Sequence, residues 1–338
     1  MPDLALTGSA DLDPAVLAER RRVVEQVEDL AAHHQVPENT RRAYAADRAD
    51  YQAWCAALAV EPWPADPGVL ALYVADPIRL DDHGEPYELR VSTIRRRLSA
   101  ISTWHRERGI EPSPARDIRV GRAVKALARR QAASGLFDHR EAAPFTLEML
   151  AATCAHLDRT RLADIRNRAL LCLGFFGALR RSELVGLDVP DLAESVEGLD
   201  VRLRQSKTDQ EGEHDPVPVP YKSDEPVCPV RAWQAWRSAA GLVAGAVFRS
   251  VDQHGHLLGG RLPDNRVSAI VKDAAMALGE DPERYSAHSL RAGFITSAAK
   301  KRVPGWAIMR HTRHQTSRVM DGYIRTATRW EENAAAML

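Results

Sequence analysis

The sequence has few of the features that mark secreted, membrane-bound or metal-binding proteins. The four cysteines are Cys55, Cys154, Cys172 and Cys228, and none are paired in CxxC or CxxxC spacing. Such a pattern is typical of buried or incidental thiols in a reducing cytosol. No run reaches the roughly 18 apolar residues of a membrane helix. The amino terminus lacks the cationic flank and apolar core of a secretory signal. We therefore expect a cytoplasmic protein without a membrane span.

The chain also lacks net charge, since its 46 basic residues balance 46 acidic ones. This neutrality hides two cationic stretches. Residues 90–130 hold twelve Arg or Lys against three Asp or Glu, and residues 288–329 hold nine against one. Solvated, arginine-rich helix faces explain one such stretch easily and two less well, and local basic patches are what DNA-binding surfaces require. The sequence therefore predicts a DNA-binding protein, associated with the nucleoid inside the cytoplasm.

Apolar periodicity and breakers predict an all-helical first domain over residues 13–133, after a disordered segment 1–12. Helices are expected over residues 13–32, 39–58, 67–75, 89–108 and 118–133. One face of the later helices packs while the other offers charge to DNA phosphates. The candidate DNA-binding residues are Arg95, Arg96, Arg97, Arg122, Lys125 and Arg129. Residues 134–144 mix glycine, charge and proline, which is typical of a linker.

The second domain, residues 145–325, is predicted to combine helices with a small β-hairpin. Thr146 is a candidate N-cap, and helices are expected over residues 161–177, 229–240, 261–278 and 289–301. Residues 201–204 and 217–219 alternate like strands, with Lys207 near the tip of the hairpin between them. The fold is thus mainly α with a small β-hairpin in the carboxyl-terminal domain. Residues 326–338 end in an apolar tail that is expected to be helical and to dock on another surface.

The end of this domain carries residues suited to gripping a phosphodiester. His288 and Arg291 share a face if the segment after His288 is helical, and backbone N–H groups at its first turn favour an anion. His314 and Tyr323 are nine residues apart, about 13.5 Å and half a turn out of phase on an unbroken helix. A break between them is required if both serve one phosphate. The segment has no acidic pair that could hold a metal, so no metal or other cofactor is expected.

Phosphoryl transfer at a DNA backbone needs positive charge near the non-bridging oxygens, a nucleophile and an acid for the leaving oxygen. Arg180 and Arg291 can supply the charge as planar forks of donors. Tyr323 can be the nucleophile and Lys207 the acid. The two histidines can donate hydrogen bonds to the phosphate or carry a proton. Which group removes the proton of the nucleophile, whose free pKa is about 10, stays open.

Seven tyrosines compete for the role of nucleophile. Tyr323 is chosen because its surroundings are cationic and it closely follows His314. Tyr285, near His288, is a weak rival. The others are expected elsewhere: Tyr44, Tyr51 and Tyr73 in the core of the first domain, Tyr87 in a turn and Tyr221 beside a proline-rich loop.

This ordered set resembles that of the tyrosine site-specific recombinases, also called the phage integrase family. Length and architecture look most like the Cre-type members. The first family box is matched by Ala178-Leu-Arg-Arg-Ser-Glu-Leu184, which gives Arg180 the role of a catalytic arginine and Glu183 that of the supporting acid. The HxxR box is matched by His288 and Arg291.

The remaining catalytic positions follow from the same resemblance. His314 takes the place of the late His or Trp, nine residues before the nucleophile, which falls on Tyr323 in Asp-Gly-Tyr-Ile. Lys207 in Gln-Ser-Lys-Thr is similar to the lysine of the family's β-hairpin. The chain departs from many members in lacking a glycine directly before the late histidine and in carrying His311 three residues earlier. If His311 were the functional residue, its distance from the nucleophile would be atypical.

The resemblance implies a two-domain enzyme, with a helical core-binding domain and an α+β catalytic domain, that clamps double-stranded DNA. It would cleave one strand through a 3′-phosphotyrosine link and exchange strands in a homo-tetramer on two inverted-repeat sites, from a monomer in solution and without a cofactor. In relatives the carboxyl-terminal tail packs on a neighbouring protomer.

Two other functions fit part of the pattern. A type IB topoisomerase uses a related Arg, Lys, His and Tyr set to relax DNA without recombining it, but the helical first domain and the compact size favour a recombinase. A non-catalytic DNA-binding regulator would have a decayed site, whereas here the residue set is complete. The target sequence, the choice among integration, excision and dimer resolution, and any accessory proteins cannot be read from the chain.

Overall fold

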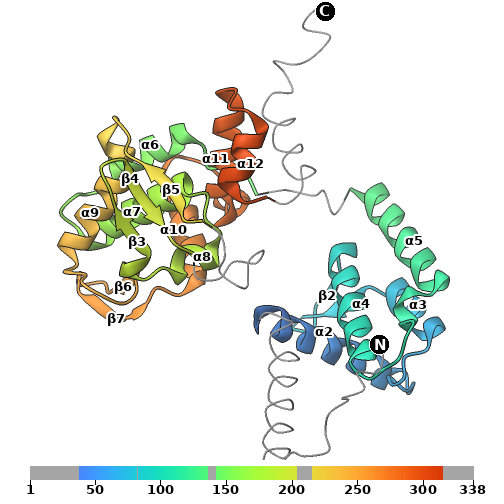
Figure 1. Cartoon of the computed structure of the whole chain (residues 1–338). Helices are drawn as coiled ribbons and strands as arrows, with labels where there is room; N and C mark the ends of the chain where they lie inside the picture. The colour runs from blue at the N-terminus through green and yellow to red at the C-terminus, as the bar shows by residue number, and fades with distance from the viewer. Residues whose placement is uncertain (1–37, 82, 136–141, 204–214, 315–338) are drawn as a thin grey trace, which may run out of the picture. The chain divides into compact units, whose positions relative to one another are not determined.

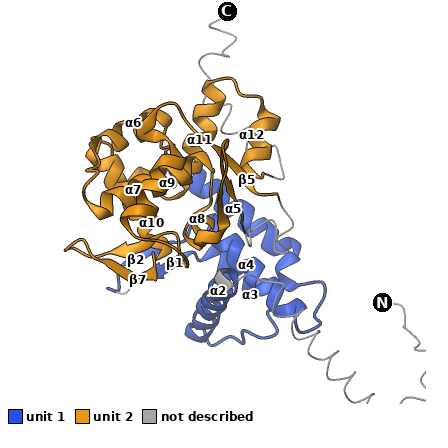
Figure 2. Cartoon of the chain, turned by 60° about the vertical axis from the view of Figure 1, so that its left-hand side comes forward, with its two compact units in different colours: residues 1–139 blue, residues 140–338 orange. Residues whose placement is uncertain are grey.

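A computed structural model describes residues 38–81, 83–135, 142–203 and 215–314. The chain divides into two compact units, Met1–His139 and Arg140–Leu338, and the division lies within the segment 134–144 (Figure 2). The described residues are mainly helical, with small antiparallel sheets (Figure 1). The predicted helix over residues 13–32 lies outside them. None of the helices in the described ranges combines the length and apolar character that crossing a membrane requires.

Unit 1 is built from helices and one short hairpin. Its elements are α2 (Glu38–Ala57), α3 (Pro67–Ala75), β1 (Ile78–Leu80), β2 (Pro86–Glu88), α4 (Val91–Arg106) and α5 (Ile118–Ser134). The helices confirm the predicted ones to within two residues at each end. The β1–β2 hairpin was not predicted, because strands of three residues are too short to show an alternating pattern.

Local chemistry explains where these helices begin and end. Asp66 caps α3 by accepting hydrogen bonds from the N–H groups of Gly68 (2.7 Å) and Val69 (3.0 Å). Asp117 caps α5 in the same way, and α5 ends at Gly135, whose φ of 63° is the left-handed conformation that glycine adopts easily. Inside the unit, Tyr51 packs edge-on against Tyr73 in a fully buried cluster. The prediction that these two tyrosines lie in the core is confirmed.

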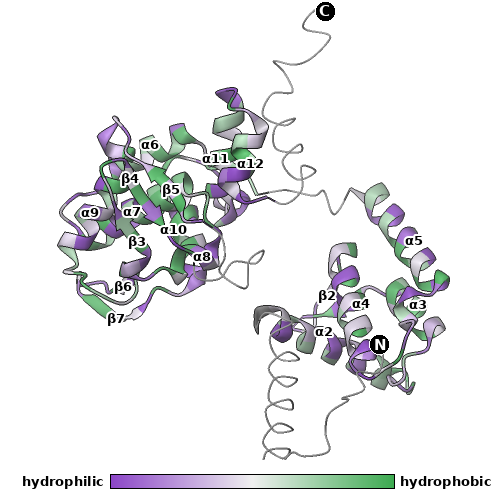
Figure 3. Cartoon of the chain, viewed as in Figure 1, coloured by the Kyte–Doolittle hydropathy of each residue, from purple (hydrophilic) through white to green (hydrophobic). Residues whose placement is uncertain are grey.

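Unit 2 is built around the buried helix α7 (Leu162–Phe176). Its other helices are α6 (Leu147–His156), α8 (Arg181–Gly186), α9 (Pro229–Ala239), α10 (Asp264–Ala277), α11 (His288–Lys300) and α12 (Gly305–Thr312). α7 packs against both α9 and α11. Every residue from Ala169 to Phe176 is buried, as are Trp233 and Trp236 on α9. Hydrophobic residues gather on α7 and on the neighbouring strands (Figure 3), and the helices predicted over residues 161–177 and 229–240 are confirmed to within one residue at each end.

The strands of unit 2 differ in part from the prediction. β3 (Leu192–Glu194), β4 (Gly198–Val201) and β5 (Val217–Pro220) form an antiparallel sheet in which Val201 lies opposite Val217. The predicted strand over residues 201–204 is wrong by three residues, because the buried residues Leu199 and Val201 decide the pairing. A second hairpin, β6 (Arg249–Val251) with β7 (Leu257–Arg261), was not predicted. Since β7 occupies the start of the predicted helix 261–278, α10 begins only after Pro263.

All four cysteines are buried free thiols, as expected from their spacing. Cys154 on α6 and Cys172 on α7 bring their Sγ atoms within 3.7 Å. Burial of this kind is usual for cysteines that serve only as small apolar side chains.

Gly293, on α11, lies directly against the backbone at the start of unit 2. A Cβ atom at this position would come within 1.8 Å of the Phe145 carbonyl oxygen. Two hydrogen bonds hold the approach, from the Phe145 N–H to the Ser289 carbonyl (2.9 Å) and from the Leu147 N–H to Ser297 Oγ (3.0 Å). Glycine here therefore sets the distance at which α11 packs.

We expect Gly293→Ala to lower the free energy of unfolding by at least about 2 kcal/mol, because the added methyl group must displace backbone. Urea unfolding of the full chain, followed by circular dichroism, measures the change. Gly121→Ala is the matched control: it lies inside α5, and no atom lies within 4 Å of the added Cβ. That variant should gain up to about 1 kcal/mol. A Gly293→Ala chain as stable as the parent would refute the assigned role of the glycine.

Candidate active site

Five of the seven residues predicted for the catalytic site lie in the described part of unit 2: Arg180, Glu183, His288, Arg291 and His314. They come from the start of α8, the first turn of α11 and the residues after α12. Lys207 and Tyr323 lie outside the described residues and stay predictions. The contacts below bring the five into one cluster.

Arg291 is the buried member of this cluster, with 2% of its surface exposed. Its Nη1 donates to the carbonyl of Ala178 (2.7 Å), and its Nη2 donates to the carbonyl of Thr312. The same Nη2 lies 3.5 Å from His314 Nδ1. One guanidinium group therefore ties α11 to the turn after α7 and to the end of α12.

The turn after α7 sets the position of Arg180. Ala178 has a φ of 45°, a left-handed conformation uncommon for a residue with a side chain, and it reverses the chain between α7 and α8. Ala178 and Leu179 are buried, whereas Arg180 is partly exposed at the N-terminus of α8. The Arg180 N–H donates to Glu183 Oε2 (2.8 Å), as in a capping box. The short helix thus begins where the arginine leaves the core.

Glu183 is a buried carboxylate shared between two arginines. Arg180 Nη1 lies 2.5 Å from its Oε1, and Arg313 Nη2 lies 2.9 Å from its Oε2. Burial would raise the pKa of this carboxyl. The charges of Arg313 and Arg180, with the hydrogen bonds from Arg180, outweigh burial and hold the pKa below its usual value. Glu183 is therefore ionised at neutral pH and can aim the Arg180 side chain.

His314 lies beside these cations and is neutral at pH 7. Burial lowers the pKa of its ring to about 4, together with the charges of Arg291, Arg180, His288 and Arg313. Its Nδ1 is 2.7 Å from Thr312 Oγ1, which fixes the ring. A neutral imidazole keeps one N–H to offer to an anion.

His288 is the first residue of α11 and is exposed. Its backbone N–H donates to Ser286 Oγ (3.2 Å). The helix was predicted to begin one residue later, and its first turn carries both members of the HxxR box. Arg291 points into the core and His288 stays at the surface, so they differ in exposure although they are three residues apart.

The two rival residues are engaged elsewhere. His311 Nε2 donates to the carbonyl of Phe176 (2.7 Å), and its ring packs against Phe294. The Tyr285 hydroxyl lies 3.2 Å from Glu280 Oε2, and burial and that carboxylate raise its pKa. A nucleophilic tyrosine needs the opposite shift. These contacts favour His314 over His311 and weigh against Tyr285.

Arg313 is the main residue that the sequence analysis missed. It directly precedes His314, at the position where many integrases have a glycine, and its side chain is 9% exposed. The missing glycine was the only signal, and it did not reveal that the replacing side chain would reach Glu183, 130 residues earlier in the chain.

The basic residues of unit 1 fall into two groups. Arg97 is buried and pairs with Asp50 (2.5 Å) and Asp47 (3.6 Å), so its charge is used inside the unit. We therefore leave Arg97 out of the DNA-binding set. Arg96 is exposed but also pairs with Asp47 (2.9 Å). The other candidates are exposed on α4 or α5: Arg95, Arg122, Lys125 and Arg129.

Acid should destabilise the protein through His314. Because its folded pKa of about 4 lies below the usual 6.5, the unfolded chain binds more protons between these values, and stability falls as the pH falls from 6.5 to 4. We expect His314→Gln to reduce this loss by about 1–3 kcal/mol, less than the full shift because solvent reaches the ring. Urea unfolding of both chains at several pH values measures it. Equal pH slopes would contradict the buried, neutral ring.

The chain is similar to known proteins in both sequence and structure. Residues 145–329, more than half of the chain, match the model of the phage integrase family. Over 299 residues the chain is 34% identical to an integrase/recombinase xerD homolog of Selenomonas ruminantium, covering 88% of this chain and 84% of that protein.

Two solved structures show the same fold at low identity. The Tn1549 transposon integrase in complex with transposon right end DNA has a TM-score of 0.57 at 17% identity, over 91% of this chain and 98% of that one. The XerH site-specific recombinase bound to palindromic difH substrate has a TM-score of 0.55 at 17% identity, over 81% and 72%. The chain therefore belongs to the phage integrase family, and it is a tyrosine recombinase.

Proposed function

We propose that this enzyme cleaves and rejoins DNA strands through a covalent 3′-phosphotyrosine formed by Tyr323, within a homo-tetramer on two DNA sites. The observation that carries the proposal is that Arg180, Arg291 and His314 come together in unit 2, with Arg180 paired to Glu183 and Arg291 Nη2 lying 3.5 Å from His314 Nδ1. The rest of the mechanism follows from what such a group can do to a phosphodiester.

The described cluster is suited to a phosphate that gains negative charge during reaction. Among the residues that the structure describes here, the three guanidinium groups of Arg180, Arg291 and Arg313 outnumber the carboxylate of Glu183. Arg180 keeps 23% of its side chain exposed and is held at both ends, so it can present donors to a ligand without reorganising. Fixed donors of this kind stabilise a transition state more than water does.

In the proposed step the Tyr323 oxygen forms a bond to phosphorus while the bond from phosphorus to the 5′ oxygen breaks. The tyrosine loses its proton, and Lys207 gives one to the leaving 5′ oxygen. A free 5′ hydroxyl from the partner strand then reverses the step. The phosphotyrosine conserves the energy of the broken bond, so rejoining needs no added cofactor.

The neutral ring of His314 limits its role in this scheme. Protonation is opposed by burial and by the surrounding guanidinium groups, so His314 is a poor source of a proton at pH 7. It can instead donate one hydrogen bond to a non-bridging oxygen. This supports assigning the acid to Lys207.

We propose double-stranded DNA with inverted-repeat sites as the partner. Arg122, Lys125 and Arg129 are exposed on α5 at spacings of three and four residues, which puts them on one face of the helix. Such a row can follow a phosphate backbone.

The tetramer would be held in part by the tail, residues 326–338, docked on a neighbouring protomer. A groove of about 770 Å³ in unit 2, between the start of β5 and α12, has a mixed polar and apolar lining. Its apolar side chains include Pro216, Pro218 and Trp306, and Trp306 is 68% exposed. The tail ends Ala-Ala-Ala-Met-Leu, which suits these apolar side chains.

The α5 row predicts a specific salt dependence. Log affinity falls as log salt concentration rises, and each phosphate contact adds about 0.9 to the steepness of this fall. Changing Arg122, Lys125 and Arg129 together to Gln should therefore make the slope shallower by about 2 to 3. Fluorescence anisotropy with duplex DNA over a range of salt concentrations measures the slope. Arg237→Gln, which removes one charge from α9 of unit 2, is the control and should leave it unchanged. An unaltered slope in the triple variant would show that DNA binds to another surface.

The nucleophile can be tested with a nicked suicide duplex carrying a site that the protein selects from a random-sequence library. We expect a covalent protein–DNA adduct that resists denaturation, and none with Tyr323→Phe. Binding without any adduct would favour a non-catalytic DNA-binding regulator. An adduct together with relaxation of supercoiled DNA, but no strand exchange between two sites, would favour topoisomerase activity.

A further inference from the structure

Arg313 stands in an unusual backbone position for an arginine. It follows α12 with a φ of 56° and a ψ of 41°, the left-handed conformation that ends many helices. Glycine adopts this conformation without steric cost, whereas a side chain makes it unfavourable. An arginine kept here must gain something from its side chain.

The side chain of Arg313 reaches back across the candidate site. Besides its bond to Glu183, its Nη1 lies 3.4 Å from the Gly177 carbonyl, and its Nη2 lies 3.4 Å from the Ala178 carbonyl. The Ala178 carbonyl also accepts from Arg291. Arg313 therefore binds the same turn that sets Arg180, while its own backbone leads directly into His314.

The shared carboxylate connects these contacts to the chemistry. Glu183 Oε2 accepts from both Arg313 Nη2 (2.9 Å) and the Arg180 N–H (2.8 Å), which leaves Oε1 to Arg180 Nη1. Among the described contacts of this network, Arg313 alone holds Oε2 from the side of α12. A carboxylate free to turn would no longer aim Arg180.

We propose that Arg313 is a positioning residue for DNA cleavage, which orients Arg180 through Glu183 and fixes the start of the segment that carries His314. The inference rests on the proposed function of this site. A purely structural ion pair between α12 and α8 would instead affect stability and leave the chemical step alone. A positioning role predicts that loss of Arg313 slows cleavage of bound DNA, whereas a purely structural role predicts an unchanged cleavage rate.

Arg313→Gly separates them, because glycine suits the backbone and removes only the side chain. We expect the single-turnover rate of adduct formation on saturating nicked duplex to fall about 100-fold, as for a catalytic group displaced by about 1 Å. DNA affinity should change less than about threefold, since Arg313 does not face the ligand in the proposal. Arg313→Lys, which keeps the charge, should recover part of the rate.

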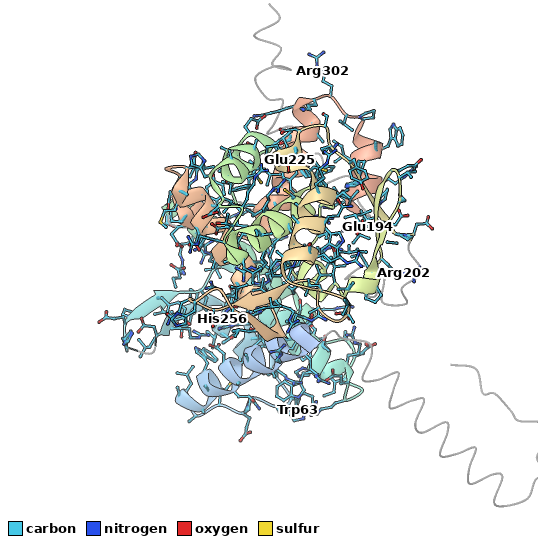
Figure 4. The ribbon with its side chains drawn as sticks, turned by 90° about the vertical axis from the view of Figure 1, so that its left-hand side faces the viewer. Trp63, Glu194, Arg202, Glu225, His256 and Arg302 are labelled. Carbon is cyan, nitrogen blue, oxygen red and sulfur yellow. The ribbon has the colours of Figure 1, made fainter. Side chains whose placement is uncertain are left out.

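Arg302→Gly is the matched control. Arg302 also has a left-handed φ, of 57°, and its side chain points away from the body of the unit (Figure 4). This variant makes the same backbone change and loses the same charge, and its cleavage rate at saturating DNA should equal that of the parent. Thermal unfolding of all variants verifies that each is folded at the assay temperature.

The route through Glu183 is tested by a double-mutant cycle. If Arg313 acts by holding that carboxylate, Arg313→Gly combined with Glu183→Gln should be no slower than the slower single variant. Independent losses, or an Arg313→Gly rate within threefold of the parent, would overturn the inference. Failure of the parent protein to form any adduct would instead reject the proposed function.

Discussion

The site depends on one buried negative charge. Three guanidinium groups within one cluster repel each other, and in a partly buried setting that repulsion is not screened by water as it would be at the surface. Glu183 offsets the charges of Arg180 and Arg313 by direct pairing. Arg291 is stabilised differently, by the carbonyls of Ala178 and Thr312. The cluster can therefore keep an excess of positive charge for a phosphate without forcing its elements apart.

The fold supplies this arrangement through chain reversals rather than through long elements. The buried helix α7 ends at a left-handed Ala178, which delivers Arg180 to the surface. A left-handed Arg313 ends α12 and delivers His314. Between them, α11 approaches the backbone of Phe145 closely at Gly293, two residues after Arg291. Arg180, Arg291 and His314 thus each lie within two residues of a position where the backbone reverses or packs closely, which restricts the orientation of their side chains.

The charges in the site also limit which chemical role each residue can take. Burial and the cations that would bind a phosphate lower the pKa of His314, so the neutral ring can donate a hydrogen bond but is a poor source of protons. A proton for the leaving oxygen must then come from a group less exposed to the same charges. The role proposed for Lys207 thus depends on the geometry of residues that the structure describes.

Much of the architecture follows from local sequence. Apolar periodicity and helix breakers predict most helices to within two residues, because these signals act over one or two turns. Some short strands were not predicted, and another was predicted at the wrong residues. Three-residue strands such as β1 have no measurable alternation, and the register of β4 depends on the opposing Val217 and Val219.

The sequence by itself determined which residues form the ordered set of Arg180, His288, Arg291 and His314, since family motifs are read from order and spacing. The roles of Lys207 and Tyr323 rest on the same reading. Only the tertiary structure decided which charges meet. It turned Arg97 inward to Asp50 and brought Arg313 to Glu183 across 130 residues. Ion pairing between distant residues depends on how helices pack, and no local pattern in a chain records that packing.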